Sequence, residues 1–225
     1  MRKKPRSALE QLLAVMARLR APEGCPWDRA QNHRTLRFHA VEEVYELLDA
    51  IETGDDHDMA EELGDLLMQV VFHAQMASER GAFDFETVCR LLVEKLIRRH
   101  PHVFGQVRNL TTAQAVWAQW DQIKQAEKAG GRAPRHSALD GIPRHLPALL
   151  RAEKLVKKAR KATLLPPHAR RAAWTRHEVA RRLFALAAYA QGRRWSAEEL
   201  LRDEARRLER QLRRKERPGV ARGRT

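Results

Sequence analysis

The sequence has few cysteines and no long hydrophobic run. Its 225 residues include only two cysteines, Cys25 and Cys89, and neither belongs to a C-x-x-C pair. This excludes a disulfide framework and favours a reducing compartment. The apolar stretch at residues 12–16 is followed closely by Arg18, which makes it too short for a signal peptide. Because no stretch approaches the roughly 20 apolar residues of a membrane span, we expect a cytoplasmic protein that does not enter a membrane.

The sequence also lacks any sustained alternation of apolar and polar residues, so it gives no sign of a β-sheet. Glycine (11 residues) and proline (10 residues) are scarce, whereas Ala, Leu, Glu and Arg are abundant, which favours helix. The predicted fold class is therefore all-α, a helical bundle. From caps and apolar periodicity we expect helices over residues 7–20, 35–51, 55–80 and 84–100, and another from 111 or 112 onward.

The net charge of +14 is divided unevenly along the chain. Residues 1–130 contain 17 Lys and Arg against 20 Asp and Glu, a net charge of −3, whereas residues 131–225 contain 26 against 9, a net charge of +17. A segment rich in glycine and proline lies at this change and indicates a domain boundary. We predict a helical domain over 1–129, a linker over 130–147, a basic helical domain over 148–216 and a disordered basic tail over 217–225.

Two acidic motifs lie on neighbouring predicted helices. Glu42, Glu43 and Glu46 form E-E-x-x-E, and Glu62 and Asp65 form E-x-x-D. Residues three or four apart share one face of a helix, and an antiparallel helix pair would bring the two motifs together. Carboxylates held this close repel one another unless a cation compensates them. Ligation by oxygen alone suits a hard cation, Mg²⁺ or Mn²⁺.

A second interpretation of these motifs is a solvated helix face. Glutamates at helical spacing are common on protein surfaces, and E-x-x-E by itself is a weak signal. Both motifs adjoin apolar residues such as Val44 and Leu63, and like charges at this spacing destabilise an ordinary surface helix. Spacing alone therefore leaves a metal site and a solvated face both open.

Four segments, two of which contain the acidic motifs, carry a resemblance to a known family. They are E-E-V-Y-E at 42–46, E-E-L-G-D-L-L at 61–67, V-V-F-H-A at 70–74 and K-L-I-R-R-H-P-H-V-F-G at 95–105. In order and spacing the chain resembles the MazG family of nucleoside triphosphate pyrophosphohydrolases, from about Leu12 to Lys128. The resemblance implies an all-α bundle that hydrolyses a nucleoside triphosphate to a monophosphate and pyrophosphate, with water attacking the α-phosphorus. It fits a role in nucleotide-pool housecleaning.

The resemblance also assigns roles to single residues. The magnesium ligands are expected at Glu43, Glu46, Glu62 and Asp65, while Glu42 would orient or deprotonate the attacking water. Lys95 and Arg99, one helical turn apart, match residues that bind the triphosphate. Trp120 and Lys124 match positions near the nucleotide. The family resemblance further implies a homodimer or a higher homo-oligomer, with sites near the interface between chains.

The basic half of the chain resembles a shortened, degenerate copy of the acidic half. Residues 176–210 follow the course of residues 60–98, with Glu178 in the place of Glu62. Arg181, however, stands where Asp65 does, and no counterpart of E-E-x-x-E is present. Because a guanidinium does not ligate magnesium, we predict that this half is not catalytic by itself.

Two other function classes remain as alternatives. The chain could be a catalytically weak regulator that binds nucleotide or a partner through the same bundle, although its retained acidic residues argue against this. Its basic half could instead bind nucleic acid, because arginines cluster over residues 206–214. We do not favour nucleic acid as the partner, since the few aromatic residues of this half have the spacing of a core.

Overall fold

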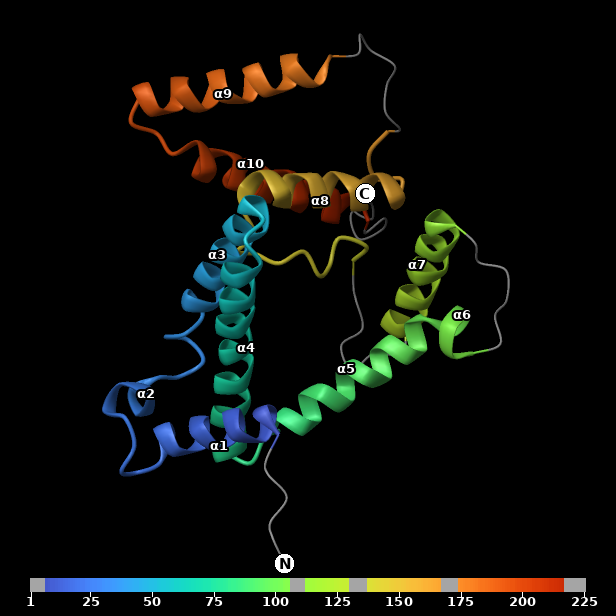
Figure 1. The fold of residues 1–225 in the computed structure, drawn as a ribbon. Coiled ribbons are helices and arrows are strands. Elements are labelled where there is room, and N and C mark those ends of the chain that lie inside the picture. The colour runs from blue at the N-terminus through green and yellow to red at the C-terminus, as the bar shows by residue number, and fades with distance from the viewer. Residues whose placement is uncertain (1–6, 106–111, 130–136, 167–173, 217–225) are drawn as a thin grey trace, which may run out of the picture. The chain divides into compact units, whose positions relative to one another are not determined.

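A computed structural model of the chain describes residues 7–105, 112–129, 137–166 and 174–216. Within these residues every regular element is an α-helix, which confirms the predicted all-α class (Figure 1). The chain divides into two compact units, Met1–Trp120 and Asp121–Thr225. No helix in the described ranges is long and apolar enough to cross a membrane.

The first unit contains most of the helices. Their bounds are α1 (Ala8–Arg20), α2 (Pro26–Ala30), α3 (His39–Thr53), α4 (Asp56–Glu79), α5 (Phe85–Arg99), α6 (Pro101–Phe104) and the beginning of α7 (Ala113–Ala129). The second unit contains α8 (Ala148–Lys161), α9 (Arg176–Gly192) and α10 (Ala197–Lys215).

Local capping residues set the ends of the helices in the first unit. Ser7 and Glu10 form a capping box at the start of α1. Asp55 accepts hydrogen bonds from two backbone N–H groups at the start of α4, and Asp84 accepts one at the start of α5. Gly54 ends α3 with φ +74°, a left-handed conformation that glycine adopts without strain. Gly54 and the cap at Asp55 together account for the tight connection between α3 and α4.

The structure departs from the sequence prediction at two places. α3 begins at His39, four residues later than expected, because Asn32 accepts hydrogen bonds from the backbone N–H groups of Arg34 and Thr35. These local bonds hold the chain in turns instead of a helix. Between the first two predicted helices, where no helix is expected, residues 26–30 form the short helix α2, and its first residue, Pro26, is well suited to that position.

The core of the first unit lies where α1 and the segment before α3 meet the second half of α4. Its buried members are Met16, Leu36, Val71, Phe72 and Met76. Helices α3 and α4 pack side by side (Figure 1). Arg20 at the end of α1 makes two hydrogen bonds of 2.7 Å to the carboxylate of Glu79, which joins α1 to the end of α4. The acidic motifs thus lie on the helix pair α3 and α4, and α1 anchors this pair at the end of α4 away from the motifs.

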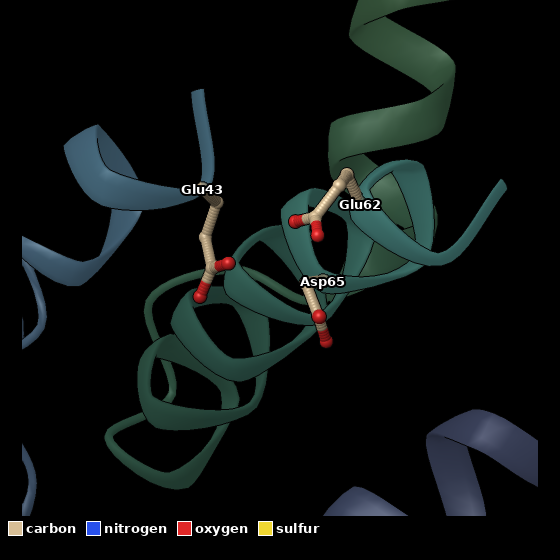
Figure 2. A group of neighbouring side chains, drawn as sticks. All are labelled: Glu43, Glu62 and Asp65. Carbon is tan, nitrogen blue, oxygen red and sulfur yellow. The ribbon is translucent and has the colours of Figure 1, made fainter. Parts of the chain in front are cut away.

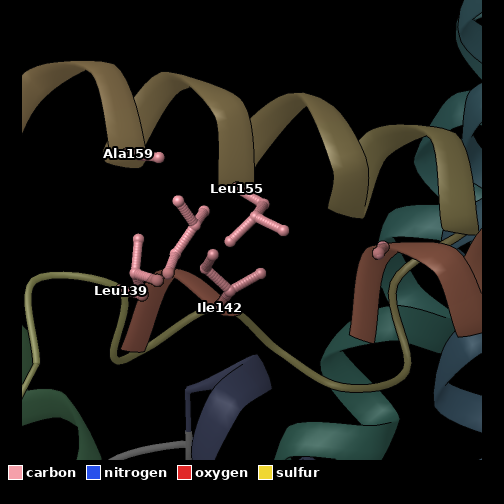
Figure 3. Packing of buried hydrophobic residues seen from close by; sticks show 6 residues of the cluster. Leu139, Ile142, Leu155 and Ala159 are labelled. Atoms are coloured by element: carbon pink, nitrogen blue, oxygen red, sulfur yellow. The ribbon is translucent and has the colours of Figure 1, made fainter. Parts of the chain in front are cut away.

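The second unit has a separate core between α8 and α10. Leu155 and Ala159 of α8 pack over a loop that carries Leu139 and Ile142 (Figure 3), and α10 contributes Ala205 and Leu212. The described part of the expected linker over 130–147 therefore packs into this core. The expected domain bounds themselves stay predictions.

Candidate metal and phosphate site

Three carboxyl groups come together where α3 faces α4. Glu43 belongs to α3, and Glu62 and Asp65 belong to the first half of α4 (Figure 2). One oxygen from each of these residues lies within 4.8 Å of the other two. Glu62 and Asp65 are three residues apart and share a face of α4, while the short turn at Gly54 folds α3 back against it. The structure therefore brings together three of the four residues expected to bind metal.

The electrostatics of this cluster favour a bound cation. Partial burial, followed by the negative charges of Glu46, Asp65 and Glu43, raises the pKa of Glu62 above its ordinary range. Within the described residues, the buried Oε2 atom of Glu62 has no hydrogen-bond partner. A buried carboxylate oxygen without a donor is costly, and a cation would satisfy it. The donor set is all oxygen, which fits Mg²⁺ or Mn²⁺.

Glu46 and Glu42 lie beside the cluster on α3. The Glu46 side chain is exposed, yet partial desolvation and then the charges of Glu43 and Glu42 raise its pKa. The negative charge of Asp65 on α4 contributes to the same shift, so Glu46 is close enough to interact electrostatically with the cluster. Glu42 lies 3.5 Å from the His39 imidazole and is outside the group of three. The roles expected of these two residues stay predictions.

Gln69 is a member of the site that the sequence analysis missed. It is buried on α4, and its Nε2 donates a hydrogen bond of 3.1 Å to Oε1 of Glu43. This bond crosses from α4 to α3 and fixes the direction of a candidate ligand. The signal for it was available in the sequence, because Gln69 follows Asp65 by four residues and so continues the acidic face of α4.

The residues expected to contact the nucleotide lie on other helices than the carboxylates, namely α5 and α7. Lys95 and Arg99 lie one turn apart on α5, which begins beyond the end of α4 that is opposite Glu62 (Figure 1). Trp120 is half-buried on α7 and packs edge-on against His100, with ring centroids 4.9 Å apart. The side chain of Lys124 lies outside the described residues.

Comparison with known proteins bears directly on this arrangement. A family model described as the MazG nucleotide pyrophosphohydrolase domain matches residues 31–104. The chain is 52% identical over 151 residues to a nucleoside triphosphate pyrophosphohydrolase of Escherichia coli K12. The alignment covers 67% of this chain and 56% of the relative. The chain belongs to the MazG family.

Other relatives carry similar names. A nucleoside triphosphate pyrophosphohydrolase/pyrophosphatase MazG of Thermotoga maritima is 47% identical over 150 residues, covering 67% of this chain and 56% of the relative. A nucleoside triphosphate pyrophosphohydrolase of Mycobacterium tuberculosis is 39% identical over 163 residues, covering 71% of this chain and 47% of the relative. The chain thus spans about half the length of these curated MazG relatives.

The MazG match includes the acidic cluster, Gln69, Lys95 and Arg99, all of which lie within residues 31–104. Trp120 and the whole second unit lie outside it. The MazG region therefore coincides with the part of the chain whose carboxylates converge, and the basic helices α8 to α10 need a separate explanation.

Proposed function

We propose that the first unit hydrolyses nucleoside triphosphates to a nucleoside monophosphate and pyrophosphate, with Mg²⁺ as the metal and Mn²⁺ as an alternative. The observation that carries this proposal is the convergence of Glu43, Glu62 and Asp65 within 4.8 Å. The names of the relatives at 52% and 47% identity support it. The reaction fits cytoplasmic housecleaning of the nucleotide pool.

Under this proposal Glu43, Glu46, Glu62 and Asp65 hold the metal. When bound there, the ion supplies positive charge that bridges the acidic site to the triphosphate and stabilises charge on the phosphoryl oxygens. Gln69 keeps Glu43 directed at the site through its 3.1 Å hydrogen bond. Acidic side chains can thereby bind a polyanionic substrate that they would otherwise repel.

The chain's own groups then divide the remaining work. Glu42 orients a water molecule or accepts its proton, and the water oxygen forms a bond to the α-phosphorus. The bond from this phosphorus to the bridging oxygen breaks, and pyrophosphate leaves. Lys95 and Arg99 bind phosphate oxygens as cations, while Trp120 and Lys124 lie near the nucleoside. For these four residues the support is the family resemblance.

We further propose that the active species is a homodimer or a higher homo-oligomer. Large apolar side chains on α3 and α4 are exposed in the isolated chain: Val41, Val44, Tyr45, Leu48, Ile51, Leu63, Leu67 and Val70. A contiguous apolar face of this kind is normally covered by another surface. A second copy of the chain is the cover that the family resemblance implies, and it would also enclose the acidic cluster.

The reaction is tested by product analysis in water enriched in ¹⁸O. A panel of nucleoside triphosphates is incubated with the purified chain and Mg²⁺, and the products are separated by chromatography. We expect monophosphate and pyrophosphate, with ¹⁸O in the monophosphate because water attacks the α-phosphorus. Label in pyrophosphate, or primary release of diphosphate and orthophosphate, contradicts this assignment. Sedimentation analysis tests the oligomer, and a monomer with full activity contradicts that part.

A further inference from the structure

A cavity of about 440 Å³ lies in the second unit, between the loop after residue 137, α8 and α10. Its volume falls within the range of small-molecule binding sites. Five arginines line it: Arg144, Arg151, Arg206, Arg210 and Arg213. Two carboxylates, Asp140 and Glu209, also line it, so its charged side chains carry a net charge of +3. We call this cavity the arginine pocket.

Arg151 is the buried member of the arginine pocket. Only 5% of the residue is exposed, and its Nη2 donates a hydrogen bond of 2.5 Å to Oε2 of Glu209. Its buried Nη1 has no hydrogen-bond partner within the described ranges. Buried guanidinium donors are nearly always satisfied by protein, water or ligand. This donor points to an acceptor that the protein itself does not provide.

The two carboxylates of the pocket are already engaged in holding it together. Glu209 accepts hydrogen bonds from Arg151 and from Arg213. Asp140 accepts one of 2.6 Å from Arg213 and one from the backbone of Ser137. These bonds fix the loop, α8 and α10 around the cavity, which is the rigid support that a binding site needs.

Arg144 and Arg210 supply the positive charge that remains. Both are exposed, and neither makes an ion pair within the described part of the chain. Arg206, the fifth arginine of the pocket, is paired with Asp203 at 3.2 Å, and Arg207 on the same helix is paired with Glu204 at 2.5 Å. Exposed cations also lie at the end of α10, at Arg214 and Lys215, but Arg144 and Arg210 are the ones that line the cavity together with the buried Arg151.

We propose that the arginine pocket binds a small phosphate polyanion, a diphosphate or triphosphate group, without a metal ion. Guanidinium groups form charge-assisted, bidentate hydrogen bonds to phosphate oxygens. The group is free pyrophosphate or tripolyphosphate, or the phosphate chain of a nucleotide. Among the described residues none that lines the cavity is aromatic, so this lining offers no stacking platform for a base. The pocket therefore recognises phosphates and is indifferent to the nucleobase. This goes beyond the proposed hydrolysis.

The proposal is tested by titration calorimetry on the full-length chain in EDTA and about 50 mM salt. The probes are pyrophosphate, tripolyphosphate, ATP, GTP, AMP and adenosine. EDTA removes divalent ions, so the acidic cluster repels the same probes. We expect one tripolyphosphate per chain, ATP and GTP within about threefold of it, and no binding of adenosine.

Two matched double variants locate the site. Arg144→Ser with Arg210→Ser removes two charges from the pocket and should weaken tripolyphosphate binding at least about tenfold, since each lost charge-assisted bond is substantial. Arg214→Ser with Lys215→Ser removes two exposed charges from α10 that do not line the pocket, and the affinity should change by less than about twofold. Surface changes of this kind leave folding nearly unaffected.

Three results would overturn the proposal. They are absence of metal-free tripolyphosphate binding, equal weakening by both double variants, and an oligonucleotide that binds more tightly than tripolyphosphate with a steep salt dependence. The hydrolysis assay is independent of this outcome. A loss of pocket binding with normal turnover keeps the proposed function, and normal pocket binding in an inactive chain keeps the pocket.

Discussion

Gln69 on α4 donates a hydrogen bond from its Nε2 to Oε1 of Glu43 on α3, across 3.1 Å. Glu43 is the only member of the three-carboxylate group on its helix. The Gln69 amide thus connects the two halves of the proposed metal site. A carboxylate held this way is directed at the metal before the metal binds, which lowers the cost of binding.

We expect Gln69→Leu to weaken Mn²⁺ binding about tenfold or more, because loss of a bond that orients a ligand typically costs 10–100-fold in metal affinity. The matched control is Gln75→Leu. Gln75 also lies on α4, and its amide donates to Glu79 instead of the cluster. Calorimetric titration with Mn²⁺ checks both. Equal affinities in the two variants would show that Gln69 does not position Glu43.

The carboxylates are tested by isosteric neutralisation. Glu46→Gln and Asp65→Asn each remove one ligand charge with little change of shape, and we expect each to lower turnover at least about 100-fold. Both variants should remain folded by circular dichroism, because they relieve repulsion between carboxylates in the metal-free protein. The control Glu61→Gln changes an exposed neighbour of Glu62 and should keep turnover within about threefold. Wild-type rates in Glu46→Gln and Asp65→Asn would refute the metal site.

The sequence was a good guide to features determined by neighbouring residues. The caps at Ser7 and Asp84 lie where the sequence predicts them, because a cap needs only a side-chain acceptor near the first N–H groups of its helix. The late start of α3 was missed because the hydrogen bonds of Asn32 compete with helix formation over the same residues. The convergence of Glu43 with Glu62 and Asp65 followed from helical spacing and a short turn.

Contacts between distant residues were not accessible in the same way. His33 and His73 are forty residues apart, and their rings stack with centroids 5.1 Å apart. The arginine pocket joins Arg144 and Arg151 to residues on α10 that lie more than fifty positions later. Neither arrangement has a local pattern, because each depends on how complete helices pack. From the sequence alone, only the excess of arginine in this half of the chain could be recognised.

The pH dependence of stability reports on Glu62. In the metal-free protein its pKa is raised by partial burial and neighbouring carboxylates, so the folded state binds more protons than the unfolded state. The contribution of Glu62 protonation to the free energy of unfolding is fully present below about pH 4.3, the ordinary pKa of glutamate. It is lost as the pH rises through the folded pKa. In EDTA, which keeps the protein free of metal, we expect wild type to lose stability relative to Glu62→Gln as the pH rises above about 4.3, measured by thermal unfolding. A difference that does not change with pH contradicts the raised pKa.

His73 gives a pH effect of opposite sign. Its pKa is lowered by burial and by the nearby His33, whose Nδ1 lies 2.8 Å from that of His73. The folded state therefore binds fewer protons than the unfolded state. The contribution of neutral His73 to the free energy of unfolding is fully present above about pH 6.5. It is lost as the pH falls below that value toward the folded pKa. Wild type should lose stability relative to His73→Gln as the pH falls below about 6.5, measured by thermal unfolding.

The degenerate second half is tested at Arg181. In the comparison of the two halves Glu178 matches Glu62, but the two carboxylates make different interactions in the structure. The Glu178 carboxylate accepts hydrogen bonds from Thr175 in a capping box, and these bonds lower its pKa, whereas that of Glu62 is raised. A carboxylate engaged in capping is not available to a metal. Arg181, in the place of Asp65, is exposed on α9.

We therefore expect Arg181→Ala to keep turnover at saturating substrate within about threefold of wild type. The matched control is Arg182→Ala. The Arg182 guanidinium lies 4.3 Å from the centre of the Trp174 ring, so this variant loses a packing contact as well as a charge. Deletion of residues 217–225 should also preserve turnover. Any effect of the deletion on kcat/KM should diminish as the salt concentration increases, because screening at about 0.15 M limits the range over which an exposed charge acts to roughly 8 Å. If Arg181→Ala abolishes turnover while the chain stays folded, the second unit contributes directly to the active site, and its assignment as non-catalytic is wrong.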